Sequence, residues 1–260
     1  MSHVDRVREE FGKQAPTFAP AETFFGARSI SDWIGSILPF SGDETVVDVA
    51  GGAGHLSRAF ADRARQFVVA DATRAMLDVG AAAVAEQGIA NVLYVEADAY
   101  ALPFTGGAFD VAMCRFALHH MTEPAKVVAE MARVVRPGGR VALIDMVAID
   151  PALAAEHDRL EILRDPSHTS ALSADAVIAA LEAAGTTPGE PIFRDQAMEY
   201  GRWIGQSKPS AEAAAEVTAA IEAEADGSGA ATGLRAARTD DGGLTVMQRW
   251  MCVVARIPPV

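Results

Sequence analysis

The feature that most constrains the fold is a glycine-rich turn between an apolar run and a helical stretch. It reads VVDVAGGAGHLSRAF and spans residues 46–60. Glycines at Gly51, Gly52 and Gly54 allow a tight turn and let a ligand approach the backbone closely at the carboxyl edge of a sheet. Taken alone, such a turn fits a dinucleotide site, a plain structural turn or a nucleoside site of another kind.

Downstream of the turn, short apolar runs alternate with helical periodicity, which predicts a parallel sheet flanked by helices. We expect strands at 46–50, 67–70, 92–96, 109–114 and 140–149, with helices at 56–65, 74–87 and 124–136. After residue 150 we expect helices at 152–164, 174–184 and 210–225, strands at 192–198 and 245–257, and a loop at 226–243.

Three carboxylates occur at three successive predicted strands. Asp48 lies inside the first strand, Asp71 ends the second and Asp98 follows the third. A carboxylate at Asp48 repels a pyrophosphate but can organise an ammonium group, directly or through water. Asp71 is placed to bind ribose hydroxyls, and Asp98 is placed to accept a hydrogen bond from an adenine amino group. The set predicts a cationic nucleoside without phosphate and disfavours a nicotinamide oxidoreductase.

Four motifs in order resemble a known family. They are VVDVAGGAGH, VADATRAML, ADAYALPF followed by FDVAMC, and EMARVVRPGGR. Together they resemble the class I S-adenosylmethionine-dependent methyltransferases, in the small-molecule branch that includes the ubiquinone/menaquinone C-methyltransferases. The resemblance covers residues 45–149, and the ordered set is specific where a single motif is not.

The resemblance implies an α/β fold with a Rossmann-like seven-stranded sheet, whose last strand is antiparallel. Helices would cover both faces, with a helical cap. In this organisation residues 1–40 are an N-terminal helical lid and residues 41–150 are the cofactor-binding core. Residues 151–260 are the C-terminal part of the same domain and contain the cap helices and the last two strands.

The resemblance also implies which residues hold the methionine and ribose parts of S-adenosylmethionine. Gly52 and Gly54 would line the methionine part, and Asp48 would lie behind its amino group. Asp71 would bind the ribose, with Ala72 next to it in the same site.

The remaining implied cofactor residues serve the adenine and the carboxypropyl tail. Met76 would pack near the adenine, and Asp98 with the amide of Ala99 would bind the adenine edge. Cys114 or Arg115, at the end of the fourth strand, would face the tail. After transfer the site would hold S-adenosylhomocysteine.

Histidines are the candidate general bases. A sulfonium methyl is already activated, so a base is needed only for a hydroxyl or an unactivated carbon. His119 and His120 follow the fourth strand at the ligand-binding edge, and a histidine has an ordinary pKa of about 6.5. His168, in the sequence RDPSH, is the third candidate. Each of them has the alternative role of capping a helix or packing inside the protein.

The expected reaction is methyl transfer to oxygen, carbon or nitrogen of a small-molecule acceptor. The candidate residues of the acceptor pocket are Gln14, Phe18, His120, Arg164, His168 and Trp203. Because no base is unambiguous, a second hypothesis stays open. The protein would then bind the cofactor but act as a non-methylating enzyme, such as a cyclase, or as a binding or regulatory subunit.

Charge and cysteine usage limit the partners. The 260 residues include 22 Lys and Arg against 35 Asp and Glu, a net charge of −13 at pH 7. Such a surface repels nucleic acid and anionic membranes. The two cysteines lie in apolar runs and do not form a metal motif, and no apolar run approaches the roughly 20 residues of a membrane helix. We therefore expect a cytoplasmic protein without a metal site, nucleic-acid partner or membrane insertion. A homodimer is left open.

Overall fold

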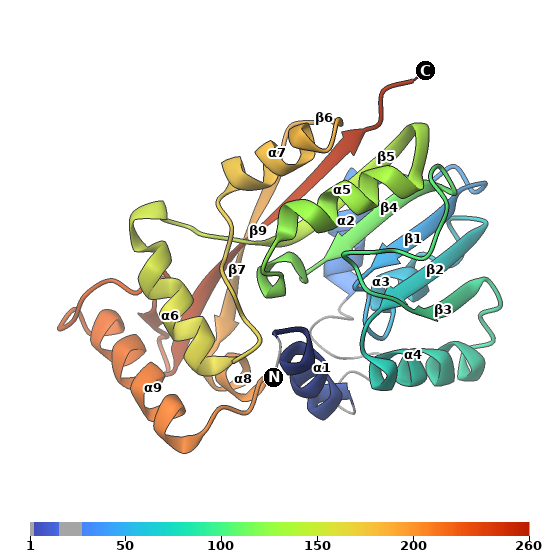
Figure 1. Ribbon diagram of the computed structural model, residues 1–260. Coiled ribbons are helices and arrows are strands. Elements are labelled where there is room, and N and C mark those ends of the chain that lie inside the picture. The colour runs from blue at the N-terminus through green and yellow to red at the C-terminus, as the bar shows by residue number, and fades with distance from the viewer. Residues whose placement is uncertain (1–2, 16–27, 260) are drawn as a thin grey trace.

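The structure is a computed structural model that describes residues 3–15 and 28–259. Its centre is a single sheet with the strand order β3-β2-β1-β4-β5-β9-β6 (Figure 1). The parallel strands are β1 (Thr45–Val49), β2 (Gln66–Asp71), β3 (Val92–Glu96), β4 (Phe109–Arg115) and β5 (Val135–Val147). The remaining strands are β6 (Thr187–Pro188), β7 (Ile192–Glu199), β8 (Ala237–Arg238) and β9 (Leu244–Arg256).

The last strand confirms the expected direction, because β9 runs antiparallel to β5. On its other side, β9 pairs with β6 and then with β7. Pro188 and Pro191 bracket the break between these two strands, since a proline has no N–H for the ladder. β8 pairs with the beginning of β9. The sheet order thus has the seven expected positions, although nine strands are counted in the described residues.

Helices cover both faces of the sheet, as expected (Figure 1). On one face, α2 (Arg28–Ile37), α3 (His55–Ala59) and α4 (Arg74–Glu86) share an apolar core with the sheet. On the other face, α5 (Pro124–Val134) and α7 (Ala174–Ala183) do the same. The central strand β1 is buried on both faces, which explains its nearly continuous apolar sequence. α3 ends at Ala59, earlier than the periodicity of residues 56–65 suggests.

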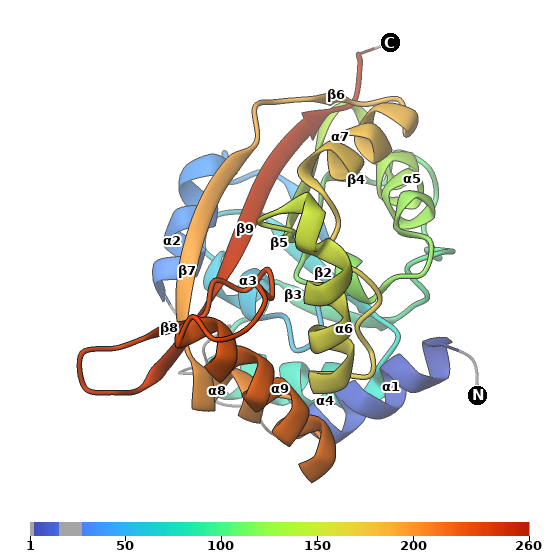
Figure 2. The ribbon, with the colours of Figure 1, turned by 90° about the vertical axis from the view of Figure 1, so that its left-hand side faces the viewer.

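A cap with its own apolar core stands at the lower end of β7 and β9 (Figures 1 and 2). It consists of α6 (Ala154–Arg164), α8 (Tyr200–Gly205) and α9 (Ala211–Ala225). The sequence pattern did not reveal α8, which has six residues and begins where the Glu199 carboxylate accepts hydrogen bonds from two backbone amides. None of the described helices is both long and apolar enough to span a bilayer.

Candidate active site

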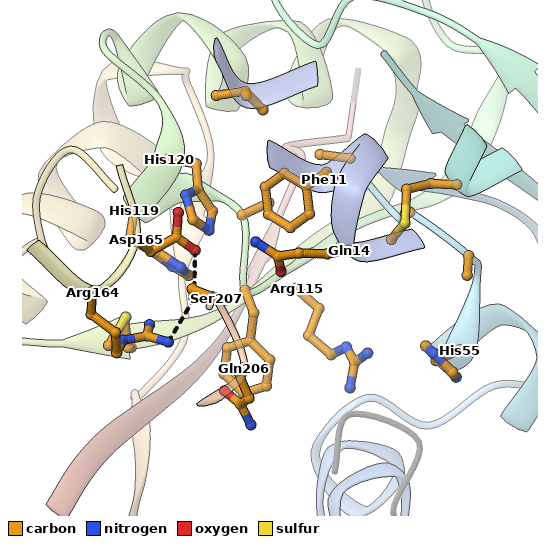
Figure 3. Close-up of a pocket in the computed structure, with 18 of the residues that line it drawn as sticks. Phe11, Gln14, His55, Arg115, His119, His120, Arg164, Asp165, Gln206 and Ser207 are labelled. Atoms are coloured by element: carbon orange, nitrogen blue, oxygen red, sulfur yellow. Dashed lines mark hydrogen bonds between the residues drawn. The ribbon is translucent and has the colours of Figure 1, made fainter. Parts of the chain in front are cut away.

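A cavity of about 530 Å³ lies at the carboxyl ends of the parallel strands. The core forms one wall, the cap another, and α1 (His3–Gln14) contributes a third. Figure 3 shows Arg115 and His55 at one end, the histidine pair with Asp165 at the other, and Phe11 and Gln14 between them. The lining includes Phe11, Gln14, Gly52, His55, Asp71, Met76, Arg115, His119, His120, Arg164, Asp165, Gln206 and Ser207.

The glycine turn directly follows β1 and forms the floor at the Arg115 end. Gly52 has φ 56° and Gly54 has φ 70°, both in the left-handed region that favours glycine. A Cβ on Gly52 would lie 2.9 Å from the Met76 methyl carbon. Gly54 does not line the cavity, because a Cβ there would meet the Tyr94 hydroxyl at 2.7 Å. Gly52 therefore shapes the ligand surface, whereas Gly54 allows close packing beneath it.

Replacing Gly52 with alanine tests this assignment. We expect a stability loss of about 1–2 kcal/mol from the left-handed backbone. We also expect roughly tenfold weaker binding of S-adenosylhomocysteine, since a shift of Met76 changes the cavity floor; about 1.4 kcal/mol corresponds to tenfold. Gly88→Ala is the matched control, because Gly88 has φ 67° and a Cβ there meets nothing within 4 Å. Calorimetry that finds equal affinity in both variants contradicts the role of Gly52.

Asp48 lies behind the turn rather than on the cavity surface. A Cβ on Gly51 would lie 2.6 Å from its carboxyl carbon. Its Oδ2 accepts a hydrogen bond from Ser57 Oγ at 2.7 Å, while its Oδ1 is buried and has no hydrogen-bond partner among the described residues. Burial raises the pKa of Asp48 to about 6, although the Ser57 hydrogen bond lowers it. A buried, half-satisfied carboxyl at this position is an electrostatic match for a cationic group in front of the turn.

Asp71 ends β2, lines the cavity and ties the second strand to the glycine turn. Its Oδ2 accepts from the Gly52 amide at 2.8 Å, and its Oδ1 accepts from the Thr73 amide at 2.7 Å. Burial raises the pKa of Asp71 despite these two hydrogen bonds. The carbonyl of Ala72, next in the chain, accepts from Arg8 Nε of α1 at 3.1 Å. This segment therefore links the core to the helix above the cavity.

At the end of β4 the alternation of side chains separates the two candidates for the tail of the cofactor. Cys114 is buried in the apolar core, and burial raises the pKa of its thiol well above the ordinary value. Arg115, on the opposite face of the strand, lines the cavity. Burial lowers the pKa of Arg115 to about 10, so that the guanidinium stays charged at neutral pH. Of the two, the structure brings only Arg115 to the cavity.

Asp98 and Ala99 follow β3 and do not line the cavity. The Asp98 side chain is exposed, and its Oδ1 accepts from the Tyr100 amide at 2.9 Å, while Ala99 is buried. Their role toward an adenine stays a prediction.

His119 is half of a buried ion pair at the opposite end of the cavity. It lies in the short helix η3 (Leu118–His120), and its Nδ1 is 2.5 Å from Asp145 Oδ1. Burial acts to lower the pKa of His119, but the charge and hydrogen bond of Asp145 outweigh it and raise the pKa. The pKa of Asp145 is lowered, because His119 outweighs burial there. The pair favours a charged imidazolium.

His120 has the opposite electrostatic environment. Its Nδ1 lies 3.1 Å from Ser167 Oγ, and its ring meets the Phe11 ring edge-to-face with centroids 5.0 Å apart. Burial, followed by the charge of His119, lowers the pKa of His120 to about 3. Two adjacent histidines thus differ in charge at neutral pH, and both line the cavity.

The segment after α6 places its residues differently from the expectation. His168 Nε2 lies 2.9 Å from Asp158 Oδ1, and the ring is buried outside the cavity lining. Instead, Asp165 lines the cavity and Ser167 contacts His120. The tight turn from Asp165 to His168 is closed by a hydrogen bond between their backbones, which directs successive side chains apart.

The other acceptor candidates divide in the same way. Gln14 and Arg164 line the cavity. Trp203 does not, because it is fully buried in the cap core, where the Arg164 guanidinium carbon lies 4.9 Å from its ring centroid. Phe18 lies outside the described residues. The sequence pattern did not single out Gln206, Ser207, Gln248 or Trp250, which reach the cavity from α8 and β9.

No metal centre is found in the part of the chain that the structure describes. No three or more His, Cys, Asp and Glu side chains there are grouped so that they could hold an ion.

Comparisons with known proteins identify the core. Residues 47–143 match the family described as "methyltransferase domain". The uncharacterized methyltransferase YcgJ of Bacillus subtilis is 39% identical over 127 residues, which cover 48% of this chain and 50% of YcgJ. The ubiquinone/menaquinone biosynthesis C-methyltransferase UbiE of Idiomarina loihiensis is 42% identical over 104 residues, covering 38% of this chain and 41% of UbiE. The matches thus span about half the length of these relatives or less.

Solved structures extend the similarity beyond the core. The crystal structure of YcgJ superposes with a TM-score of 0.79 and 26% identity, covering 89% of this chain and 99% of YcgJ. The [4+2]-cyclase SpnF has a TM-score of 0.58 and 23% identity, covering 89% of this chain and 81% of SpnF, which shows the shared fold alone. The core is therefore a class I methyltransferase domain, and the resemblance seen in the four motifs is confirmed.

Proposed function

We propose that the protein transfers a methyl group from S-adenosylmethionine to a small molecule. The observation that carries the proposal is a single cavity with a glycine turn and Asp71 at one end and His120 at the other. A cavity of about 530 Å³ is within the range of small-molecule sites, roughly 300–1,000 Å³. The net charge of −13 supports a small-molecule acceptor over a nucleic acid.

The residues present fit the cofactor. Asp48, with its unpartnered buried Oδ1, favours an ammonium group in front of Gly51. Asp71 keeps lone pairs for ribose hydroxyls beyond the two amide hydrogen bonds that orient it. Arg115 offers a charged donor for a carboxylate.

The adenine end of the proposed cofactor site comes from the neighbouring strands. Met76 lines the cavity beside Gly52, while Asp98 and Ala99 would contact the adenine edge at the end of β3. When bound, S-adenosylmethionine supplies a methyl group on a sulfonium, which needs no further activation.

The residues of this chain then orient the acceptor and exclude water. Phe11 and Gln14 of α1 lie between the two ends of the cavity (Figure 3). His120 is a neutral imidazole there, because burial lowers its pKa to about 3. Alignment in a dry cavity is an effective source of acceleration when the donor is already activated.

Affinity for S-adenosylhomocysteine should depend on the charge of Asp48. Burial raises the pKa of Asp48 to about 6, so its negative charge is lost as the pH falls through that value. We expect affinity to fall about tenfold between pH 7 and pH 5, as the carboxylate becomes the neutral acid. Calorimetry across this range measures the effect. Asp48→Asn should flatten the profile at the low affinity, and a wild-type affinity that is equal at both pH values contradicts the role of Asp48.

Transfer itself is tested with methyl-labelled S-adenosylmethionine and a panel of phenols, amines and carboxylic acids. The proposal predicts S-adenosylhomocysteine and a labelled small molecule in equal amounts. The structural similarity to a cyclase motivates the alternative of a non-methylating enzyme on the same fold. A product formed without label transfer, while the cofactor stays bound and intact, would favour that alternative.

A further inference from the structure

A chain of buried hydrogen bonds connects His120 to the turn that follows α6. His120 Nδ1 lies 3.1 Å from Ser167 Oγ, which lies 2.5 Å from Asp165 Oδ1. The Ser167 amide donates to the same carboxylate oxygen at 2.9 Å. His120, Asp165 and Ser167 are 7%, 5% and 0% exposed. Water therefore does not compete for these bonds, and each donor needs its acceptor.

Asp165 sets the direction of every bond in this chain. Its Oδ2 accepts from Ser207 Oγ at 3.0 Å, and Ser207 Oγ accepts from the Arg164 guanidinium at 2.9 Å. Burial acts to raise the pKa of Asp165, but Arg164 and the hydrogen bonds of Ser167 help to lower it. An ionised carboxylate can only accept hydrogen bonds, so the Ser167 hydroxyl must donate to Asp165.

The direction at Ser167 determines the tautomer of His120. Since the Ser167 proton points to Asp165, its oxygen offers only lone pairs to the imidazole. The hydrogen bond at His120 Nδ1 then requires a proton on that nitrogen, and Nε2 of the neutral ring carries a lone pair. No described residue hydrogen-bonds to Nε2, and the ring lines the cavity.

The neighbouring histidine opposes a second proton on His120. The ring centroids of His119 and His120 are 4.1 Å apart, and Asp145 holds His119 in its charged form. A charge this close disfavours a second imidazolium. The other titratable groups that face His120 are Asp165 and His168, and His3 Nε2 contacts its carbonyl at 2.7 Å.

We infer that Asp165 and Ser167 are positioning residues that hold His120 as the tautomer protonated on Nδ1. The cavity wall then presents Nε2 as a permanent hydrogen-bond acceptor. Resting on the proposed function, this wall selects an acceptor molecule whose methylated group is a hydroxyl or an amine, because these groups donate a hydrogen bond to Nε2.

Nitrogen-15 NMR of the full chain, labelled at histidine, tests the tautomer directly. The sequence has six histidines, and the signal that disappears in His120→Gln is that of His120. We expect the wild type to show a protonated Nδ1 and an unprotonated Nε2 from about pH 5.5 to pH 8, across the ordinary histidine range. In Ser167→Ala we expect a mixture of both tautomers. Ser36→Ala, at an exposed serine that bonds only to the backbone of its own helix, is the control that leaves the signal unchanged.

Two results would overturn the positioning role: a wild-type His120 protonated on Nε2, or an unchanged tautomer in Ser167→Ala. If that variant does not fold, Asp165→Asn tests the same point. Its neutral amide no longer requires the serine proton, so a mixture is again expected.

Titration of the same samples with S-adenosylhomocysteine keeps this test separate from that of the proposed function. Absence of binding with the expected tautomer would refute the cofactor proposal alone. In the transfer assay, a new methyl on oxygen or nitrogen supports the selected acceptor class, and a new carbon–methyl bond overturns it.

Discussion

Asp71→Asn should weaken the binding of S-adenosylhomocysteine by about 100-fold. Hydrogen bonds to a charged group contribute about 1.5–3 kcal/mol each, and a loss of about 3 kcal/mol corresponds to ~100-fold in affinity. The variant loses the negative charge at the proposed ribose site. It also turns one of the two oxygens that accept from the Gly52 and Thr73 amides into a donor. Both effects act on the same ligand surface, and calorimetry measures their sum.

Asp78→Asn is the matched control for this change. Asp78 is exposed on α4 and pairs with Arg74 within the same helix, a contact worth only a few tenths of a kcal/mol. We expect unchanged affinity in this control and similar thermal unfolding of both variants. If Asp71→Asn binds within threefold of the wild type, the ribose assignment fails.

The second large effect is expected on turnover. His120→Ala should lower kcat about 100-fold with the acceptor found in the transfer assay, at the lower end of the range for a group that accepts a substrate proton or hydrogen bond. Binding of S-adenosylhomocysteine should change by less than about twofold, because His120 lies at the opposite end of the cavity from Asp71 (Figure 3). Steady-state kinetics and calorimetry on one preparation separate the two quantities.

His120→Gln is the informative partner variant, since its amide oxygen can take the place of Nε2 as an acceptor. We expect it to recover part of the turnover that alanine loses. Equal turnover in the wild type and His120→Ala would remove His120 from the reaction and leave it a packing residue beside Phe11.

The local pattern of the sequence predicted the cofactor half of the fold well. The apolar strand, the glycine turn and the following helix lie within fifteen residues, so their geometry depends on neighbours in the chain. Asp71 follows for the same reason, because the end of a parallel strand is set by its own apolar run. The direction of β9 came from the resemblance to a family, which carries long-range information that periodicity lacks.

The acceptor half was harder to predict, because its side chains meet across the fold. Nothing local decides whether Cys114 or Arg115 faces the cavity, since one residue of register exchanges the faces of a strand. The same ambiguity applies to Ser167 and His168 in a tight turn. Trp203 has the composition of a pocket residue, yet the packing of α8 against the cap buries it completely.

The central claim is tested most directly by titrating the purified full chain with S-adenosylhomocysteine and, separately, with NAD. We expect one molecule of S-adenosylhomocysteine to bind per chain, with an affinity that Asp71→Asn abolishes or greatly weakens, and no binding of NAD. Absence of S-adenosylhomocysteine binding, or tight binding of NAD in its place, would contradict the assignment of this cavity.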